Sequence, residues 1–233
     1  MAWLAQLFRP KVELPDELVR AIEAWRVLPE SPDSAAIDET RFMVLDVETS
    51  GLDPRRDRLL SIGAVVVERM RLTPREAFNV VLRNQWPSTR ENVVVHGLTP
   101  TRQAAGEIPE RALGGFLEFV GKSPCVAFHA DFDRIVLDRA LRAELGVRLS
   151  NPWIDAARLA PILFPEARLV HGALDDWLAY FRLRAHTRHD AVHDAYATAE
   201  IFLILLARAG ARGISTLAQL RAAAHAHERI TTG

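Results

Sequence analysis

The chain has 233 residues and is 49% hydrophobic, and its 30 acidic and 29 basic residues leave a formal net charge of −1. This length suits one α/β domain with a substantial core and short appendages. The charge balance excludes a globally basic protein, so any nucleic-acid contact would come from local charge. The single cysteine, Cys125, excludes an internal disulfide and fits a reducing cytoplasm.

The sequence also argues against a membrane partner. No apolar run approaches the ~18–20 residues needed to span a bilayer. The opening stretch MAWLAQLFRPK lacks the basic leader, the long apolar region and the small-residue cleavage site of a secretory signal. We therefore expect a cytoplasmic protein.

The first 40 residues predict an appendage. In LPDELVRAIEAWRVL, Leu18, Ile22 and Trp25 stand at helical spacing, with Pro15 near the start of the helix. The following PESPDSAAIDET is rich in Pro, Ser and Asp and predicts a linker. We expect a helical extension and linker over 1–40, a main domain over 41–210 and a helical tail over 211–233.

Strand patterns come first in the main domain and then alternate with helices. RFMVLDVE, RLLSIGAVVVE and EAFNVVLR predict three consecutive strands. The later segments predict, in order, a helix in ERALGGFLEFVG, a buried strand in CVAFH, a helix in FDRIVLDRALRAELG, a short strand and a helix in PWIDAARLAPILF, and helices in GALDDWLAYF, AVHDAYATAEIFLILLARAG and STLAQLRAAAHAHER. This order predicts a mixed sheet flanked by helices.

A pair of carboxylates lies where the first strand ends. LDVETSGLD places Asp46 and Glu48 directly after the apolar run 42–45. Side chains alternate along a strand, so both carboxylates project from one face, at the carboxyl end where open α/β sheets place their sites. Adjacent carboxylates repel each other, and a hard divalent cation between them would stabilise the pair. The alternative is the start of a solvated turn.

Two further polar clusters follow. In CVAFHADFD a buried strand again ends, and Asp131 and Asp133 follow at a helix start, where an ordinary helix cap is the alternative. In RHDAVHDAYATAEIF, His189 and His193 have the i, i+4 spacing of a zinc pair. His189 and Asp194 are five residues apart, about 140° on a regular helix, so they converge only if His189 precedes the helix or lies in a distorted first turn.

Taken together, these three segments resemble the DEDDh family of 3′–5′ exonucleases, which includes the proofreading subunit of bacterial replicative polymerases, ribonuclease T and oligoribonuclease. DVETSGL resembles the first motif of the family, FHADFD the second and HDAVHD the third. VHGLTP resembles a segment that lies over the terminal nucleotide, and the resemblance covers roughly residues 41–206.

The resemblance implies a ribonuclease H-like fold: a mixed five-stranded sheet flanked by helices. It implies two divalent cations, Mg²⁺ or Mn²⁺, held by Asp46, Glu48, Asp133 and Asp194. Ligands that are all oxygen suit these ions better than zinc, and two such ions can clamp a phosphodiester. His189 would take the proton of the attacking water, since an imidazole titrates near working pH. The products would be nucleoside 5′-monophosphates removed from a 3′ end.

The same resemblance implies contacts with the terminal nucleotide from Thr49, Gly51, Leu52, His96 and Phe132. Phe132 has an alternative role, which is to anchor the start of its helix in the core. Many relatives carry His-Asn where this chain has Phe128-His129, so His129 either keeps a polar contact near the site or is a tolerated variant. We assign Asp131 to a helix cap rather than to the ligand set.

Two groups of arginines flank the expected site. They are Arg55, Arg56 and Arg58 in PRRDR, and Arg182, Arg184 and Arg188 in FRLRAHTRH. Their interpretation has two alternatives: contacts with phosphates upstream of the scissile bond, or solvated loops.

Three functions are open from the sequence alone. The leading hypothesis is a 3′–5′ exonuclease for proofreading or repair that acts on single-stranded or frayed 3′ ends of DNA. The alternative is an exoribonuclease similar to oligoribonuclease, because the motifs do not reveal whether the site reads a 2′-OH. The third is a nucleic-acid-binding module without catalysis. Association with a DNA polymerase, the oligomeric state and the role of the first 40 residues are open as well.

Overall fold

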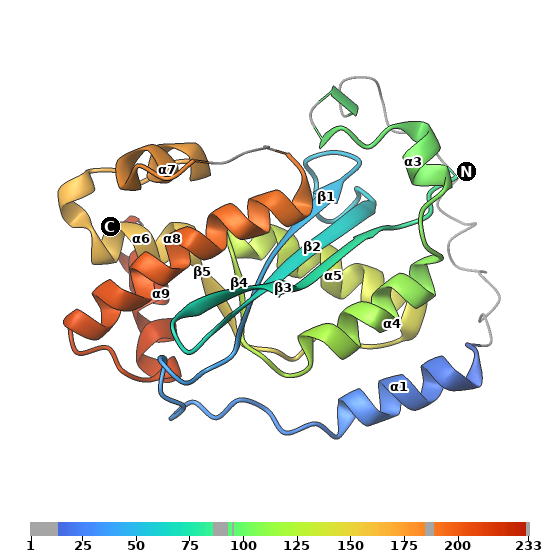
Figure 1. Cartoon of the computed structure of the whole chain (residues 1–233), viewed down its shortest axis with the longest axis horizontal. Coiled ribbons are helices and arrows are strands. Elements are labelled where there is room, and N and C mark those ends of the chain that lie inside the picture. Colours follow the sequence, from blue (N-terminus) through green and yellow to red (C-terminus); the bar gives the residue numbers. More distant parts are fainter. Residues whose placement is uncertain (1–13, 86–92, 95, 185–188, 232–233) are drawn as a thin grey trace.

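The molecule is built around one mixed β-sheet with helices on both faces (Figure 1). The computed structural model describes residues 14–85, 93–94, 96–184 and 189–231, with side chains as far as residue 226. The strands are β1 (Phe42–Thr49), β2 (Leu59–Glu68), β3 (Arg71–Val81), β4 (Cys125–Ala127) and β5 (Trp153–Asp155), and they lie in the order β3-β2-β1-β4-β5. The expected five-stranded, ribonuclease H-like architecture is confirmed.

The first three strands form an antiparallel meander, and the last two run parallel to β1. β1 is therefore central in the sheet and is buried on both faces, and Phe42, Met43, Val44 and Leu45 have no exposed surface. β1 pairs with β4 only at Met43 and Val44, so its carboxyl-terminal half extends beyond the end of β4. This overhang is where the two carboxylates lie.

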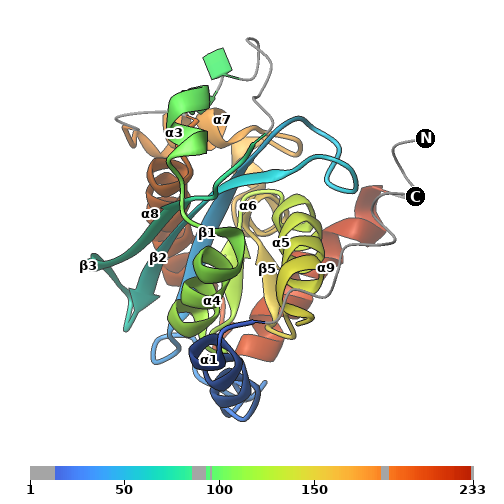
Figure 2. The same ribbon diagram turned by 90° about the vertical axis from the view of Figure 1, so that its right-hand side faces the viewer.

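The helices divide between the two faces of the sheet (Figures 1 and 2). α1 (Asp16–Arg26), α4 (Pro109–Val120) and α5 (Ala130–Leu145) contribute to the apolar cluster on one face. α6 (Ala156–Leu163), α7 (Leu174–Phe181), α8 (Ala191–Ala211) and α9 (Leu217–Thr231) contribute to the cluster on the other. None of the described helices is long and apolar enough to cross a membrane.

Three local differences from the sequence predictions have physical reasons. β3 begins at Arg71, five residues before the predicted start, because an edge strand tolerates Pro74 where the register shifts. Two short helical segments, α3 (Pro100–Ala104) and η2 (Pro165–Ala167), were not predicted. β4 ends at Ala127, before His129, which has a left-handed backbone with φ of 66° and precedes α5.

The described part of the N-terminal extension packs on the main domain. α1 buries Leu18, Ile22 and Trp25, and Trp25 donates its indole N–H to the carbonyl of Gly121 at 2.8 Å. The segment after α1 then hydrogen-bonds to the residues just before α9, where the amide of Ile37 donates to the carbonyl of Ser215 at 3.0 Å. The domain boundaries at residues 40 and 210 stay predictions.

Candidate metal centre

Asp46 and Glu48 point to the face of the sheet that α8 covers. Along β1, Met43, Leu45 and Val47 belong to the core on the α5 side, while Phe42 and Val44 belong to the core on the α8 side. The even-numbered carboxylates therefore face α8, as strand alternation requires. Both are half-buried.

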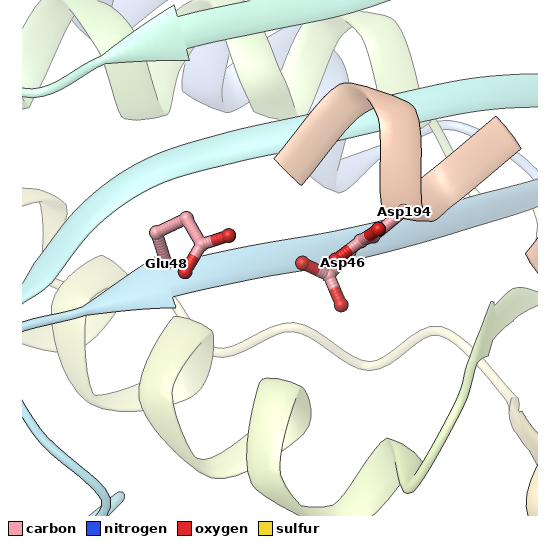
Figure 3. Close-up of side chains that lie close together, drawn as sticks. All are labelled: Asp46, Glu48 and Asp194. Atoms are coloured by element: carbon pink, nitrogen blue, oxygen red, sulfur yellow. The ribbon is translucent and has the colours of Figure 1, made fainter. Parts of the chain in front are cut away.

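Asp194, on α8, completes a group of three carboxylates. One oxygen atom from each of Asp46, Glu48 and Asp194 lies within 4.8 Å of the other two (Figure 3). Asp194 is the fourth residue of α8, so its side chain lies in the first turn of the helix, close to the strand. In the part of the chain that the structure describes, these residues form the one group of three or more His, Cys, Asp or Glu side chains suited to a metal ion.

A glycine on β2 permits this approach. Gly63 pairs with Asp46 across the sheet, and a Cβ added at Gly63 would come within 2.1 Å of the main chain of Ala191 and Val192. The start of α8 therefore lies directly on the sheet, and this contact brings Asp194 to β1. The sequence analysis did not identify Gly63, and its only signal was a glycine inside an otherwise apolar strand.

Asp133 approaches the same strand end from the opposite face. It lies on α5 with only 3% of its surface exposed, and its Oδ1 accepts the main-chain N–H of Val47 at 3.1 Å. β4 ends before it reaches Val47, so no carbonyl of β4 accepts the Val47 amide. The Asp133 carboxylate accepts it instead, at a position between Asp46 and Glu48 on the strand. Burial raises its pKa well above the ordinary value, the hydrogen bond from Val47 lowers it, and the negative charges of Asp155 and Glu48 raise it.

His189 precedes α8 in a left-handed conformation, with φ of 61°. Its main-chain N–H donates to Oδ2 of Asp194 at 3.0 Å, which connects the two residues across their i, i+5 spacing. His189 is exposed. The sequence analysis allowed His189 and Asp194 to converge if His189 precedes the helix, and the structure places His189 there.

His193 has a different environment. It lies inside α8, and its ring Nδ1 is 3.0 Å from Oδ1 of Asp190, the residue that caps the helix. The two histidines therefore do not share one helix face as a zinc pair would, and neither belongs to the group of side chains that could hold a metal ion among the described residues. A donor set of carboxylate oxygens suits Mg²⁺ or Mn²⁺.

The five residues expected to contact substrate occupy several environments. Thr49 is buried and donates its hydroxyl to the carbonyl of Gly51, while Leu52 is 92% exposed. His96 is 5% exposed, its Nδ1 accepts from the amide of Leu98 at 3.0 Å, and burial lowers its pKa. Phe132 is half-buried and packs against the core on the α5 side, as its alternative reading requires.

Asp131 does not cap α5, because this helix has no side-chain cap and Asp131 instead forms ion pairs with Arg134 at 3.0 Å and Arg158 at 2.8 Å. His129 is exposed and occupies the N-cap position, where its amide donates to Oδ1 of Asp155 at 3.2 Å. Asp155 therefore joins the ends of β4 and β5 through this contact.

Comparisons with known proteins agree with the geometry. The model of the family described as Exonuclease matches residues 43–202, so the chain belongs to this exonuclease family. The chain is 29% identical over 188 residues to the DNA polymerase III PolC-type protein of Caldanaerobacter subterraneus subsp. tengcongensis (strain DSM 15242 / JCM 11007 / NBRC 100824 / MB4). The aligned region covers 81% of this chain and 13% of that protein.

It is also 27% identical over 165 residues to the DNA polymerase III subunit epsilon of Aquifex aeolicus (strain VF5), covering 71% of this chain and 80% of that protein. A structure of Exonuclease X in complex with 5′ overhanging duplex DNA has the same fold, with a TM-score of 0.60 and 21% identity over 78% of this chain and 99% of that chain. The chain spans only 13% and 15% of the length of two PolC-type relatives.

Proposed function

We propose that the chain is a metal-dependent exonuclease that hydrolyses phosphodiester bonds at the 3′ end of DNA, for proofreading or repair, and releases nucleoside 5′-monophosphates. The observation that carries this proposal is the convergence of Asp46, Glu48 and Asp194 at one strand end, in a chain of the exonuclease family. Its substrates would be single-stranded or frayed 3′ ends.

Four carboxylates would hold two divalent cations, Mg²⁺ or Mn²⁺. Three of them, Asp46, Glu48 and Asp194, would share the cluster on the α8 side, and Asp133 would approach from the α5 side. When bound, such ions supply an activated water and stabilise charge on the leaving oxygen. The strand β1 and the helices α5 and α8 would hold the carboxylates in position before an ion binds.

His189 would act as the general base. Its main chain is fixed by the hydrogen bond to Asp194, while its exposed imidazole is available to accept a proton from the attacking water. Leu52 would contact the terminal nucleotide through its exposed side chain, with Thr49 and Gly51 shaping the loop that carries it. His96 and Phe132 are further candidate contacts.

The test of this function is a digestion of matched DNA and RNA strands, each labelled at the 5′ end, with Mg²⁺ or Mn²⁺ supplied. We expect a descending ladder from the DNA strand with mononucleotide release, slower digestion of RNA, and no cleavage of a circular single strand. Cleavage of the circle would contradict exonuclease action, and faster digestion of RNA would establish an exoribonuclease instead.

We further propose that the chain acts together with a DNA polymerase. The names of its relatives support this, since one is a PolC-type DNA polymerase III and another an epsilon subunit of DNA polymerase III. Co-elution of the purified chain with the polymerase catalytic subunit of the same organism in size-exclusion chromatography is the expected result. Separate elution at micromolar concentrations of both would contradict the association.

A further inference from the structure

The loop between β1 and β2, residues 50–58, is tightly folded next to the candidate metal centre. The main chains of Ser50 and Arg58 close its base, where the amide of Ser50 donates to the carbonyl of Arg58 at 2.9 Å. Asp57 folds inward beneath Gly51: its carboxylate accepts the hydroxyl of Ser50 at 3.1 Å and the amide of Asp53 at 2.8 Å. The loop therefore has a defined shape rather than that of a solvated linker.

This arrangement engages both acids of the loop within the loop itself and leaves its arginines exposed, although the Asp53 side chain is also 47% exposed. Asp53 and Asp57 are both engaged by main-chain amides of the loop. Arg55, Arg56 and Arg58 are exposed, and Arg56 pairs only loosely with Asp53, at 3.5 Å. No acidic side chain of the described residues forms an ion pair with Arg55 or Arg58, so arginines outnumber acids on the exposed surface of the loop.

Arg139 attaches this loop to α5. Its guanidinium donates to the main-chain carbonyls of Arg56 and Asp57, across more than 80 residues of sequence. Figure 2 shows the loop between β1 and β2 extending over α5. Arg139 follows Asp133 by six residues, or about 9 Å along a helix axis, so one helix positions both a carboxylate of the site and the arginine loop.

The outer face of α5 carries further arginines next to the loop. A shallow depression of about 480 Å³ is lined by Arg134, Ile135, Asp138, Arg139, Arg142 and Ala143. It carries three arginines and one aspartate, and two of the arginines are paired with acids: Arg142 with Asp138 at 2.8 Å and Arg134 with Asp131 at 3.0 Å. Arginines therefore extend from the loop, next to the candidate metal centre, along the helix, although two of those on the helix are paired with aspartates.

We infer that the 50–58 loop and the adjoining face of α5 bind the phosphate backbone of the nucleic-acid strand beyond its terminal nucleotide. Arg55 and Arg58 contact phosphates, and Arg139 is a positioning residue that holds the loop. This inference rests on the proposed exonuclease function, and it identifies the substrate as a strand of several nucleotides rather than a dinucleotide. Exposed guanidinium groups on a preformed loop suit phosphate binding, because the main chain of the loop does not have to be ordered when the strand binds.

The test compares two substrates that differ in length. One is the p-nitrophenyl ester of thymidine 5′-monophosphate, which engages only the metal centre, and the other is a single strand of about 20 nucleotides. In the double variant Arg55→Gln/Arg58→Gln we expect KM for the strand to rise about tenfold, kcat to stay unchanged and hydrolysis of the ester to stay unchanged. Two lost phosphate contacts should also lower the slope of log K against log salt by ~1.4 for a single strand.

The matched control is Arg71→Gln/Arg75→Gln, which removes two exposed arginines of β3. It should keep the KM and the salt slope of the parent protein. Arg139→Met should raise KM for the strand while leaving ester hydrolysis unchanged, as expected for a residue that only positions the loop. Equal KM and salt slopes in the loop variant and the control would overturn the inference, as would an equal loss on the ester.

Binding of the strand in EDTA, measured by fluorescence anisotropy, separates this inference from the proposed function. If the parent protein hydrolyses neither substrate, the exonuclease proposal fails, but the loop variant should still bind the strand about tenfold more weakly than the control. If the parent protein is active and the loop variant binds the strand as tightly as the control, only the phosphate surface is refuted.

Discussion

Two acidic regions lie at the carboxyl ends of strands in this sheet, and they are built in opposite ways. At the end of β1, carboxylate oxygens of Asp46, Glu48 and Asp194 come within 4.8 Å of one another. Near the end of β5, Asp131 and Asp155 are instead bridged by Arg158, at 2.8 Å and 3.4 Å.

The second region also satisfies its carboxylates with main-chain donors. Oδ1 of Asp155 accepts from the amides of Ala157, at 2.9 Å, and Arg158, at 3.3 Å, and so caps α6. Asp155 still has a raised pKa, chiefly through burial, with Arg158 acting in the opposite direction. The comparison teaches that acids at a strand end do not define a metal site by themselves. Carboxylates directed at one another do, because a cation can relieve their mutual repulsion.

The comparison is tested most strongly by removing one carboxylate from each region. Asp46→Ala should lower exonuclease turnover by more than about 10³-fold while leaving the fold intact, because several kcal/mol of transition-state stabilisation depend on the metal site. Asp131→Asn, in the arginine-bridged region, should change turnover by less than about threefold, or under 1 kcal/mol. Circular dichroism and a mononucleotide-release assay measure both. Substantial turnover by Asp46→Ala would show that the metal assignment is wrong.

The two histidines of the third motif sharpen the distinction between a carboxylate site and a zinc site. His189→Ala should lower kcat by ~10²–10⁴-fold, the usual contribution of a general base, while Mn²⁺ binding survives. His193→Ala should cost far less, because His193 contacts Asp190 rather than the carboxylate cluster. Equal losses at both positions, with stoichiometric zinc in the untreated protein, would favour a zinc hydrolase.

Asp133 provides a test in the absence of metal. Burial raises the pKa of this carboxyl group, so the folded state loses stability as the pH rises from the ordinary carboxyl range through the raised pKa. Asp133→Asn removes that cost and keeps an oxygen to accept the Val47 amide. In EDTA at neutral pH we expect Tm to rise by about 2–4 °C, which corresponds to ~1 kcal/mol for a domain of this size.

That gain should shrink as the pH is lowered toward the ordinary carboxyl range, where the parent protein also carries a protonated Asp133. Thermal melts of both proteins across this pH range provide the measurement. A lower Tm for Asp133→Asn at neutral pH would show that the charged carboxylate is stabilised in the fold.

The smallest effect is expected in the arginine-bridged region. Asp131 is about half exposed, with a side-chain exposure of 52%, so its ion pairs with Arg134 and Arg158 are screened by solvent. Asp131→Asn should therefore lower stability by at most about 1 kcal/mol, and less at high salt. Urea melts at low and high ionic strength measure this. A loss of several kcal/mol would mean that this region supports the fold more than its exposure indicates.

Much of this architecture could be predicted from local patterns. The buried strand β1 follows from its continuous apolar run, and the shared orientation of Asp46 and Glu48 follows from strand alternation. The sequence also showed that His189 and Asp194 can converge if His189 lies before α8. Residues i and i+5 point about 140° apart on a regular helix and so cannot converge within one. These features depend only on neighbours in sequence.

The remaining features depend on contacts between distant segments. Gly63 matters only because α8 crosses the sheet at that point, and the Val47 amide is available to Asp133 only because β4 stops early. The attachment of Arg139 to the loop after β1 likewise joins elements far apart in the chain. No local pattern distinguishes such residues from an ordinary strand glycine or a surface arginine on a helix.

The most direct test of the central claim is calorimetric titration of the metal-free protein with Mn²⁺, in parallel with Asp46→Asn and Asp131→Asn. The account predicts two bound ions per chain in the parent protein and in Asp131→Asn, with at least one ion lost in Asp46→Asn. Equal binding by all three proteins, or no binding by the parent protein, would contradict the claim that the carboxylates at the end of β1 form the metal centre.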